Sequence, residues 1–100
     1  MGELVAVAFP GGSITGAPKI RAMEVIAELE QTPRGVYCGS IGYFSFSGYA
    51  DLNIAIRTAQ FAKGLARVSG GGGITARSDP ASEYDETLAK VTRIMEAFAP

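Results

Sequence analysis

The chain has 100 residues, of which 47% are hydrophobic and 19% are charged, and its formal net charge is −1. These values are typical of one small soluble domain or of a piece of a larger one, and they exclude a general electrostatic attraction to nucleic acid or to an anionic membrane. No apolar run approaches the roughly 18 residues that a membrane span needs. The single cysteine, Cys38, fits a reducing compartment such as the cytoplasm. The absence of histidine excludes a Ser-His-Asp or Cys-His mechanism within this chain.

The first third of the chain predicts a helix that follows a loop rich in glycine and proline. Residues 4–9, LVAVAF, are compatible with a short strand or with the end of a helix. The loop at 10–19, PGGSITGAPK, precedes a segment whose apolar residues recur at spacings of three and four. Pro18 suits a first helical turn, and we expect the helix to end near residues 31–35, QTPRG.

The rest of the chain predicts a three-stranded antiparallel meander and a second helix. Strands are expected at 36–46, 52–59 and 65–69. The sequence AKG at 62–64 is typical of a hairpin turn between the last two strands. Asp79 and Pro80 are typical of an N-cap and a first helical position, so we expect a helix from about residue 80 to residue 97. The predicted class is α+β, in the order helix, meander, helix.

Alternation divides the second predicted strand into two faces. One face holds Leu52, Ile54 and Ile56, and the other holds Asn53, Ala55 and Arg57. The apolar face predicts core packing, whereas the other face is either exposed to solvent or a binding surface. Arg57 is compatible with simple solvation, but its planar guanidinium also suits a carboxylate bound by two hydrogen bonds. Tyr37 and Tyr43 share a face of the preceding strand, where they either pack or donate phenol hydrogen bonds.

Three charged residues, Glu83, Glu86 and Lys90, share one face of the last predicted helix. This face lies away from the apolar stripe formed by Tyr84, Leu88, Val91, Met95 and Phe98. A plain ion pair between Glu86 and Lys90 on a solvated surface explains the spacing. Two carboxylates one turn apart also suit Mg²⁺, which prefers oxygen ligands and often takes one or two carboxylates together with substrate oxygens.

Two glycine-rich segments each allow two interpretations. Residues 69–74, SGGGGI, form either a flexible hairpin tip or a backbone that approaches a ligand closely and offers N–H groups to an anion. The loop at 10–19 is either a turn that caps the helix or an anion site supplied by Ser13, Thr15 and nearby amides. A Walker-type phosphate loop is not supported, because the lysine and Ser/Thr that should follow the glycines are missing. Arginine, glycine backbone, hydroxyls and paired carboxylates together suit a small polycarboxylate bound through Mg²⁺.

Four blocks of this sequence, in their order and spacing, resemble the C-terminal signature of the chorismate-utilising enzymes. They are PGGSITGAPKIRAMEVIAELE, YCGSIGYFSFSGYADLNIAIRT, GGGI and SDPASEYDETLAK. The resemblance covers about residues 9–97. It implies that residues 1–100 are the C-terminal portion of a chorismate-binding catalytic domain, an α+β fragment of the family's α/β sandwich. Within the family, PGGSITGAPK and CGSIGY are more similar to aminodeoxychorismate synthase component I than to anthranilate synthase component I.

The resemblance implies amination of chorismate by ammonia to 4-amino-4-deoxychorismate, a precursor of p-aminobenzoate and folate. It also implies Mg²⁺ as cofactor and a glutamine amidotransferase partner that supplies the ammonia. The alternatives are anthranilate synthase activity and a non-catalytic small α+β domain. The upstream half of the family's catalytic domain, which carries the general-acid glutamate, has no counterpart in these residues. We therefore expect no catalytic residue within this chain, and we expect the chain alone to be inactive.

The resemblance further implies which residues contact the substrate and the metal. The substrate-binding residues are Ser13, Tyr37, Arg57, Gly71, Gly73 and Lys90, and the metal ligands are Glu83 and Glu86. In the family's pattern the tyrosine and the arginine hold the enolpyruvyl carboxylate, and the serine lies near the ring carboxylate. The glycines offer backbone amides to the substrate carboxylates, and the lysine lies near the Mg²⁺ site.

Overall fold

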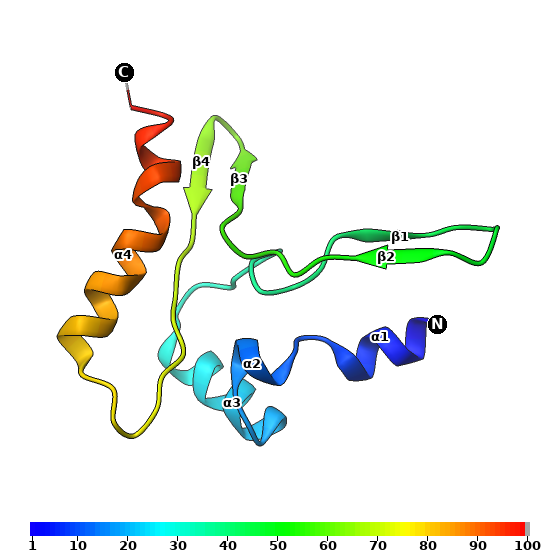
Figure 1. Cartoon of the computed structure of the whole chain (residues 1–100), viewed down its shortest axis with the longest axis horizontal. Coiled ribbons are helices and arrows are strands. Elements are labelled where there is room, and N and C mark those ends of the chain that lie inside the picture. Colours follow the sequence, from blue (N-terminus) through cyan, green and yellow to red (C-terminus); the bar gives the residue numbers. More distant parts are fainter. Residues whose placement is uncertain (100) are drawn as a thin grey trace. The chain divides into compact units, whose positions relative to one another are not determined.

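The computed structural model describes residues 1–99 (Figure 1). The described residues divide into two compact units, residues 1–55 and the residues from 56 onward. The helices are α1 (Gly2–Ala8), α2 (Gly12–Thr15), α3 (Lys19–Leu29) and α4 (Pro80–Glu96). The strands are β1 (Gly42–Phe44), β2 (Ala50–Leu52), β3 (Ala59–Ala62) and β4 (Leu65–Val68). The predicted α+β class is confirmed. Among the described residues, no helix has the length and apolar character that crossing a membrane requires.

The strands form two separate antiparallel hairpins. Strand β1 pairs with β2, with Gly42 opposite Leu52, and β3 pairs with β4, with Ala59 opposite Val68. The predicted three-stranded meander is therefore wrong, and so is its continuous second strand. The break lies between β2 and β3, where Arg57 has a φ angle of +49°. This left-handed conformation is incompatible with an extended strand.

The first predicted strand is also shorter than expected, because residues 35–38 form a turn. Gly35 and Cys38 have positive φ angles of 66° and 67°, which no extended strand accommodates. Tyr37 therefore lies in the turn. It does not share a strand face with Tyr43, which lies on β1, so the predicted tyrosine pair is wrong.

Ala55 is the most deeply buried residue of the first unit, with 1% of its surface exposed. Its amide donates to Gly39 O at 2.9 Å, and its carbonyl accepts a hydrogen bond of 2.9 Å from the amide of Cys38. Small side chains at these positions let the two backbone segments approach closely. Ile54 and Ile56 are 43% and 44% exposed. The predicted core face of this segment is therefore wrong, since alanine is buried there and the isoleucines are not.

Helix α3 of the first unit follows the predicted pattern, and α1 shows which of the two predicted conformations residues 4–9 adopt. Residues 4–9 belong mainly to a helix rather than to a strand. Helix α3 ends at Leu29, shortly before the QTPRG segment, as expected. Lys19, at the start of α3, donates from Nζ to the carbonyls of Val7 and Phe9, at 2.9 Å each. A lysine at this place satisfies carbonyl groups that the end of α1 leaves without a helical partner.

In the second unit, the β3–β4 hairpin packs beside α4 (Figure 1). Lys63 and Gly64 form its two-residue turn with φ angles of 51° and 75°. Two positive φ angles are typical of a type I′ turn, whose twist matches that of the strands. The ring of Phe61 meets the ring of Phe98 edge-on, with 5.4 Å between the centroids. The predicted turn at 62–64 is confirmed.

Helix α4 begins as the sequence predicts. The Asp79 carboxylate accepts a hydrogen bond of 2.9 Å from the amide of Ser82, and Pro80 occupies the first helical position. The backbone hydrogen bond from Ser82 holds the pKa of Asp79 below its usual value, because it stabilises the ionised carboxylate. The N-cap therefore fixes where α4 starts.

The face of α4 that is packed within this unit differs from the predicted apolar stripe. Val91 is 6% exposed, but the other members of the stripe remain exposed, namely Tyr84, Leu88, Met95 and Phe98. Glu83, Thr87 and Lys90 are half-buried instead. The glycine segment lies against this face, because a Cβ at Gly70 would lie 2.6 Å from Val91 Cγ1 and 3.0 Å from Thr87 O. Only glycine allows so close an approach.

Candidate functional site

Three of the predicted site residues line a single hollow in the second unit. The hollow has a volume of about 560 Å³, and its lining residues are Arg57, Glu86, Ala89, Lys90, Arg93 and Ile94. All of them except Arg57 come from α4. Ala89, Lys90, Arg93 and Ile94 follow Glu86 by three, four, seven and eight positions, so these five residues share one face of the helix. Arg57 comes from the segment before β3. The fold thus brings Arg57 to the helix face that carries Glu86 and Lys90.

The ammonium group of Lys90 connects α4 to the glycine segment. Its Nζ lies 2.9 Å from Glu86 Oε1 and donates a hydrogen bond of 3.2 Å to Gly71 O. The Lys90 and Glu86 side chains are 31% and 55% exposed. An ion pair this accessible contributes only about 0.3–0.5 kcal/mol to stability. The pair matters to the site mainly because it holds the Lys90 ammonium between the Glu86 carboxylate and the Gly71 carbonyl.

Gly72 lies beside three charged side-chain ends. A Cβ at Gly72 would lie 3.3 Å from Glu83 Oε2, 3.6 Å from Lys90 Nζ and 3.8 Å from Glu86 Oε1. The two carboxylates therefore converge on the backbone at this glycine. The sequence prediction named the glycines on either side and missed Gly72, because nothing within a run of four glycines marks the one that meets the helix.

The two glycines predicted as amide donors differ in their surroundings. Gly71 offers its carbonyl to Lys90 Nζ. A Cβ at Gly73 would meet no atom within 4 Å, so this backbone borders open space. Both residues lie next to the charged cluster, and the contact of their amides with substrate carboxylates stays a prediction.

The donor atoms at Gly72 fit Mg²⁺ in part. Glu83 and Glu86 present carboxylate oxygens, and Mg²⁺ in proteins is often held by one or two carboxylates with water and substrate oxygens as the other ligands. Within residues 1–99, no group of three or more His, Cys, Asp or Glu side chains is arranged to hold a metal. The ammonium of Lys90, 2.9 Å from Glu86, shows that positive charge is accommodated there. Two carboxylates are therefore what the described residues can contribute.

Arg57 combines a strained backbone with an exposed side chain. A left-handed conformation costs a residue with a side chain about 1–2 kcal/mol, and Arg57 adopts it with φ of +49°. Such conformations persist where the surrounding structure demands them, and they cluster at functional sites. Within residues 1–99, the Arg57 guanidinium has no carboxylate partner. Its charge is therefore available at the hollow.

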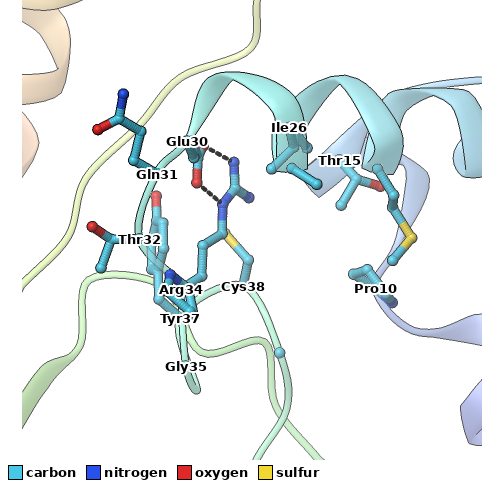
Figure 2. Close-up of a pocket in the computed structure, with 14 residues that line it drawn as sticks. Pro10, Thr15, Ile26, Glu30, Gln31, Thr32, Arg34, Gly35, Tyr37 and Cys38 are labelled. Atoms are coloured by element: carbon cyan, nitrogen blue, oxygen red, sulfur yellow. Dashed lines mark hydrogen bonds and ion pairs between the residues drawn. The ribbon is translucent and has the colours of Figure 1, made fainter.

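Tyr37, another predicted site residue, lies in the first unit. It lines a separate hollow of about 500 Å³ bounded by α3 and the loop after it (Figure 2). The Arg34 guanidinium lies 5.8 Å from the centre of the Tyr37 ring and binds Glu30 through two hydrogen bonds, one of them 2.8 Å from Nε to Oε2. Burial raises the pKa of the Tyr37 phenol, with a smaller opposing effect from Arg34. The phenol is therefore protonated at neutral pH and able to donate.

Ser13 also lies in the first unit, on the short helix α2, and its side chain is exposed. The neighbouring amide of Thr15 donates to Gly11 O at 3.1 Å, and the Thr15 hydroxyl donates to the same oxygen at 3.2 Å. Thr15 is thus committed within the loop, which leaves Ser13 as the accessible hydroxyl of the predicted anion site. Ser13 and Tyr37 belong to a different unit from Arg57 and Lys90.

Comparison with known proteins relates these residues to one family. The chorismate binding enzyme family matches residues 1–96. The chain belongs to this family. It is 57% identical over 93 residues to aminodeoxychorismate synthase component 1 of Klebsiella aerogenes, which covers 93% of this chain and 21% of that protein. It is 55% identical over 94 residues to the Escherichia coli protein of the same name, and the match covers 94% of this chain and 21% of that protein.

The chain is also similar to anthranilate synthase component 1 of Mycobacterium tuberculosis, at 47% identity over 97 residues, or 97% of this chain and 19% of that protein. It therefore spans about a fifth of the length of these relatives. The family predicted from the four sequence blocks is confirmed. The higher identity to the aminodeoxychorismate synthases agrees with the preference drawn from PGGSITGAPK and CGSIGY.

Proposed function

We propose that this chain is the C-terminal portion of the catalytic domain of an aminodeoxychorismate synthase component 1. The reaction is chorismate plus ammonia to 4-amino-4-deoxychorismate plus water. The observation that carries the proposal is the hollow that Arg57 shares with Glu86 and Lys90, beside Glu83 and the glycine backbone. This arrangement suits a ligand with more than one carboxylate.

Two ends of the substrate are bound in different ways. Arg57 binds the enolpyruvyl carboxylate through its guanidinium, which matches a carboxylate with two parallel hydrogen bonds. Glu83 and Glu86 would hold Mg²⁺ for the ring carboxylate. Fixing both ends places the reacting ring carbon in one orientation, which lowers the entropic part of the barrier. Ser13, Tyr37 and the amides of Gly71 and Gly73 are proposed as further contacts from the family resemblance.

The metal-binding pair contributes charge stabilisation. Bound to Glu83 and Glu86, Mg²⁺ would supply a Lewis acid that neutralises the ring carboxylate and stabilises the negative charge that develops there. Lys90 balances the charge of Glu86 and lies within reach of the same hollow. We assign no general acid to this chain, so protonation of the departing hydroxyl is left to residues outside it.

Partners and location follow from the same proposal. The relatives are named component 1, which implies a second component, and we propose a glutamine amidotransferase that supplies ammonia. A single cysteine that forms no disulfide suits the reducing cytoplasm, which is the location we propose. The many exposed apolar side chains, such as Phe46 and Tyr84, support a chain that packs against further protein.

The proposal is tested by replacing the matching 93 residues of the Klebsiella aerogenes relative with this chain. The hybrid is supplied with chorismate, ammonium and Mg²⁺, and the products are separated chromatographically. We expect 4-amino-4-deoxychorismate, and an activity loss of about a hundredfold for Glu83→Ala and for Glu86→Ala. Chorismate binding that ignores Mg²⁺ and survives Glu83→Ala would remove the metal site, and a folded hybrid without amination would refute the function.

A second candidate is anthranilate synthase component 1. Its support is the 47% identity over 97 residues with the Mycobacterium tuberculosis relative, which is lower than the identity to the aminodeoxychorismate synthases. The product of the same hybrid separates the two candidates. Anthranilate as the product would replace the first proposal with the second.

A further inference from the structure

The hollow in the second unit has a third cation that the sequence patterns did not single out. Arg93 lines it together with Arg57 and Lys90. Arg93 follows Lys90 by three positions on α4 and therefore lies on the same face of the helix. Within the described residues, no carboxylate lies within salt-bridge distance of Arg93.

The charges around the hollow are unbalanced. Glu86 is its one acidic lining residue, and it is already paired with Lys90 at 2.9 Å. Lys90 also donates to Gly71 O at 3.2 Å, so its ammonium is directed to the glycine segment. Among the described residues, the guanidinium groups of Arg57 and Arg93 remain without a counter-charge at one hollow. The two positive charges repel each other, and an anion bound between them replaces this repulsion with attraction.

The two kinds of charge are separated along α4. Glu83 precedes Arg93 by ten positions, which corresponds to about 15 Å along the helix axis. The carboxylates of Glu83 and Glu86 converge on Gly72. Arg93 lines the hollow seven positions after Glu86, which lies at the other end of the same lining face. With Mg²⁺ held by Glu83 and Glu86, as proposed above, a ligand with a carboxylate at each end matches this order better than a ligand with one carboxylate.

We propose that Arg93 is a specificity-determining residue that binds, together with Arg57, one carboxylate of a small dicarboxylate ligand. The guanidinium of Arg93 supplies a second pair of charge-assisted donors to the carboxylate held by Arg57. The effect is selection of dicarboxylates over monocarboxylates of the same shape. The identity of that dicarboxylate as chorismate rests on the proposed function, as does the Mg²⁺ that would receive the other carboxylate, whereas the role of Arg93 rests on the hollow alone.

A structural role for Arg93 predicts a different result. Arg93 lies in the last turn of α4, where a cation interacts favourably with the helix dipole. Replacing it with glutamine removes this effect as well as the ligand contact. The test therefore has to compare two ligands in one variant, because a helix effect alone weakens both equally.

The experiment uses the full 100-residue chain with Mg²⁺ and two probes of matched shape. The probes are 3-(carboxymethoxy)benzoate, which has two carboxylates, and 3-methoxybenzoate, which lacks the second. Binding is measured by titration with amide-detected NMR, and the melting temperature is recorded for each variant. The variants are Arg93→Gln, Arg93→Lys and the matched control Arg77→Gln, which removes an exposed arginine that does not line the hollow.

We expect the unaltered chain to bind the dicarboxylate at least tenfold more tightly than the monocarboxylate. Arg93→Gln reduces that ratio about tenfold, beyond any equal weakening of both ligands. Arg93→Lys keeps part of the ratio, and Arg77→Gln keeps all of it. An unaltered chain without preference for the dicarboxylate overturns the proposal. So does an Arg93→Gln chain with the original ratio, whatever its melting temperature.

The outcome is independent of the chorismate assignment. Suppose that the preference for the dicarboxylate depends on Arg93 but the hybrid does not aminate chorismate. This result supports the role of the arginine pair and refutes the proposed function. Amination by the hybrid, with a ratio that ignores Arg93, supports the function and overturns the role of Arg93.

Discussion

Lys90 Nζ lies 2.9 Å from Glu86 Oε1, so this chain supplies its own cation to a carboxylate that we propose as a ligand of Mg²⁺. The lysine and the ion therefore compete for Glu86. Competition makes metal affinity depend on a residue that is not a metal ligand. It also gives the metal-site proposal a test that requires no turnover.

Lys90→Gln is expected to bind Mg²⁺ about threefold to tenfold more tightly in the absence of an organic ligand. The physical reason is the loss of a positive charge beside Glu86, which is worth about 1 kcal/mol for solvent-exposed charges roughly 4 Å apart in water. Calorimetric titration with MgCl₂ measures the effect. Lys63→Gln, on the exposed β3–β4 turn, is the matched control and is expected to leave the affinity unchanged. Equal affinity in Lys90→Gln and the unaltered chain would show that Glu86 does not bind the ion.

Gly70→Ala is expected to lower the free energy of unfolding of the second unit by about 1–3 kcal/mol, a cost typical of overpacking. The new Cβ would lie 2.6 Å from Val91 Cγ1 and 3.0 Å from Thr87 O, and the helix backbone cannot move away cheaply. Urea denaturation followed by circular dichroism measures the change. Gly73→Ala is the control, because a Cβ there meets nothing within 4 Å. Similar destabilisation by both substitutions would contradict the close packing of Gly70.

The N-cap of α4 makes its helicity depend on acid pH. Hydrogen bonds from Ser82 lower the pKa of Asp79 below its usual value of 3.8. The cap therefore stabilises α4 fully above that pH and loses its effect as the pH falls through the folded-state pKa. We expect Asp79→Ala to reduce the far-ultraviolet helix signal at neutral pH. Asp79→Asn keeps the signal, because asparagine caps equally well, and removes the acid-dependent part. An unchanged acid dependence in Asp79→Asn would assign it to another group.

Arg57→Gly is expected to stabilise the chain by about 1 kcal/mol relative to Arg57→Ala, because glycine adopts a positive φ without steric cost. Both substitutions remove the guanidinium, so both are expected to raise the apparent KM for chorismate in the hybrid enzyme, with part of the loss in kcat. Thermal denaturation and steady-state kinetics separate the two effects. Kinetics unchanged by Arg57→Ala would remove Arg57 from the site.

The parts of the fold that the sequence predicted correctly depend on local signals. Asp79 and Pro80 mark the start of α4, and the AKG turn forms because glycine accepts a positive φ. The strand predicted through Arg57 failed because no neighbouring residue signals a left-handed arginine. Ala55 is buried by pairing with Cys38 and Gly39, which lie far away in the chain, so alternation of side chains could not reveal it.

The candidate site was predictable to a similar extent. The Glu86–Lys90 pair follows from a spacing of four positions on a helix, and the structure contains it. Gly72 and Arg93 were missed, because their importance arises only when the glycine segment and the Arg57 segment are brought to α4. Spacing along one helix shows which side chains share a face, but not what the rest of the chain places opposite that face.

The glycine run has a consequence for how this sequence is able to change over evolutionary time. Gly70 is held by the shape of α4, while Gly72 borders the carboxylates and Lys90. A homologous chain that no longer used the charged cluster would still need Gly70 for packing, but it could replace Gly72. Within this run of identical residues, packing therefore limits substitution at Gly70, whereas the charged groups beside it limit substitution at Gly72.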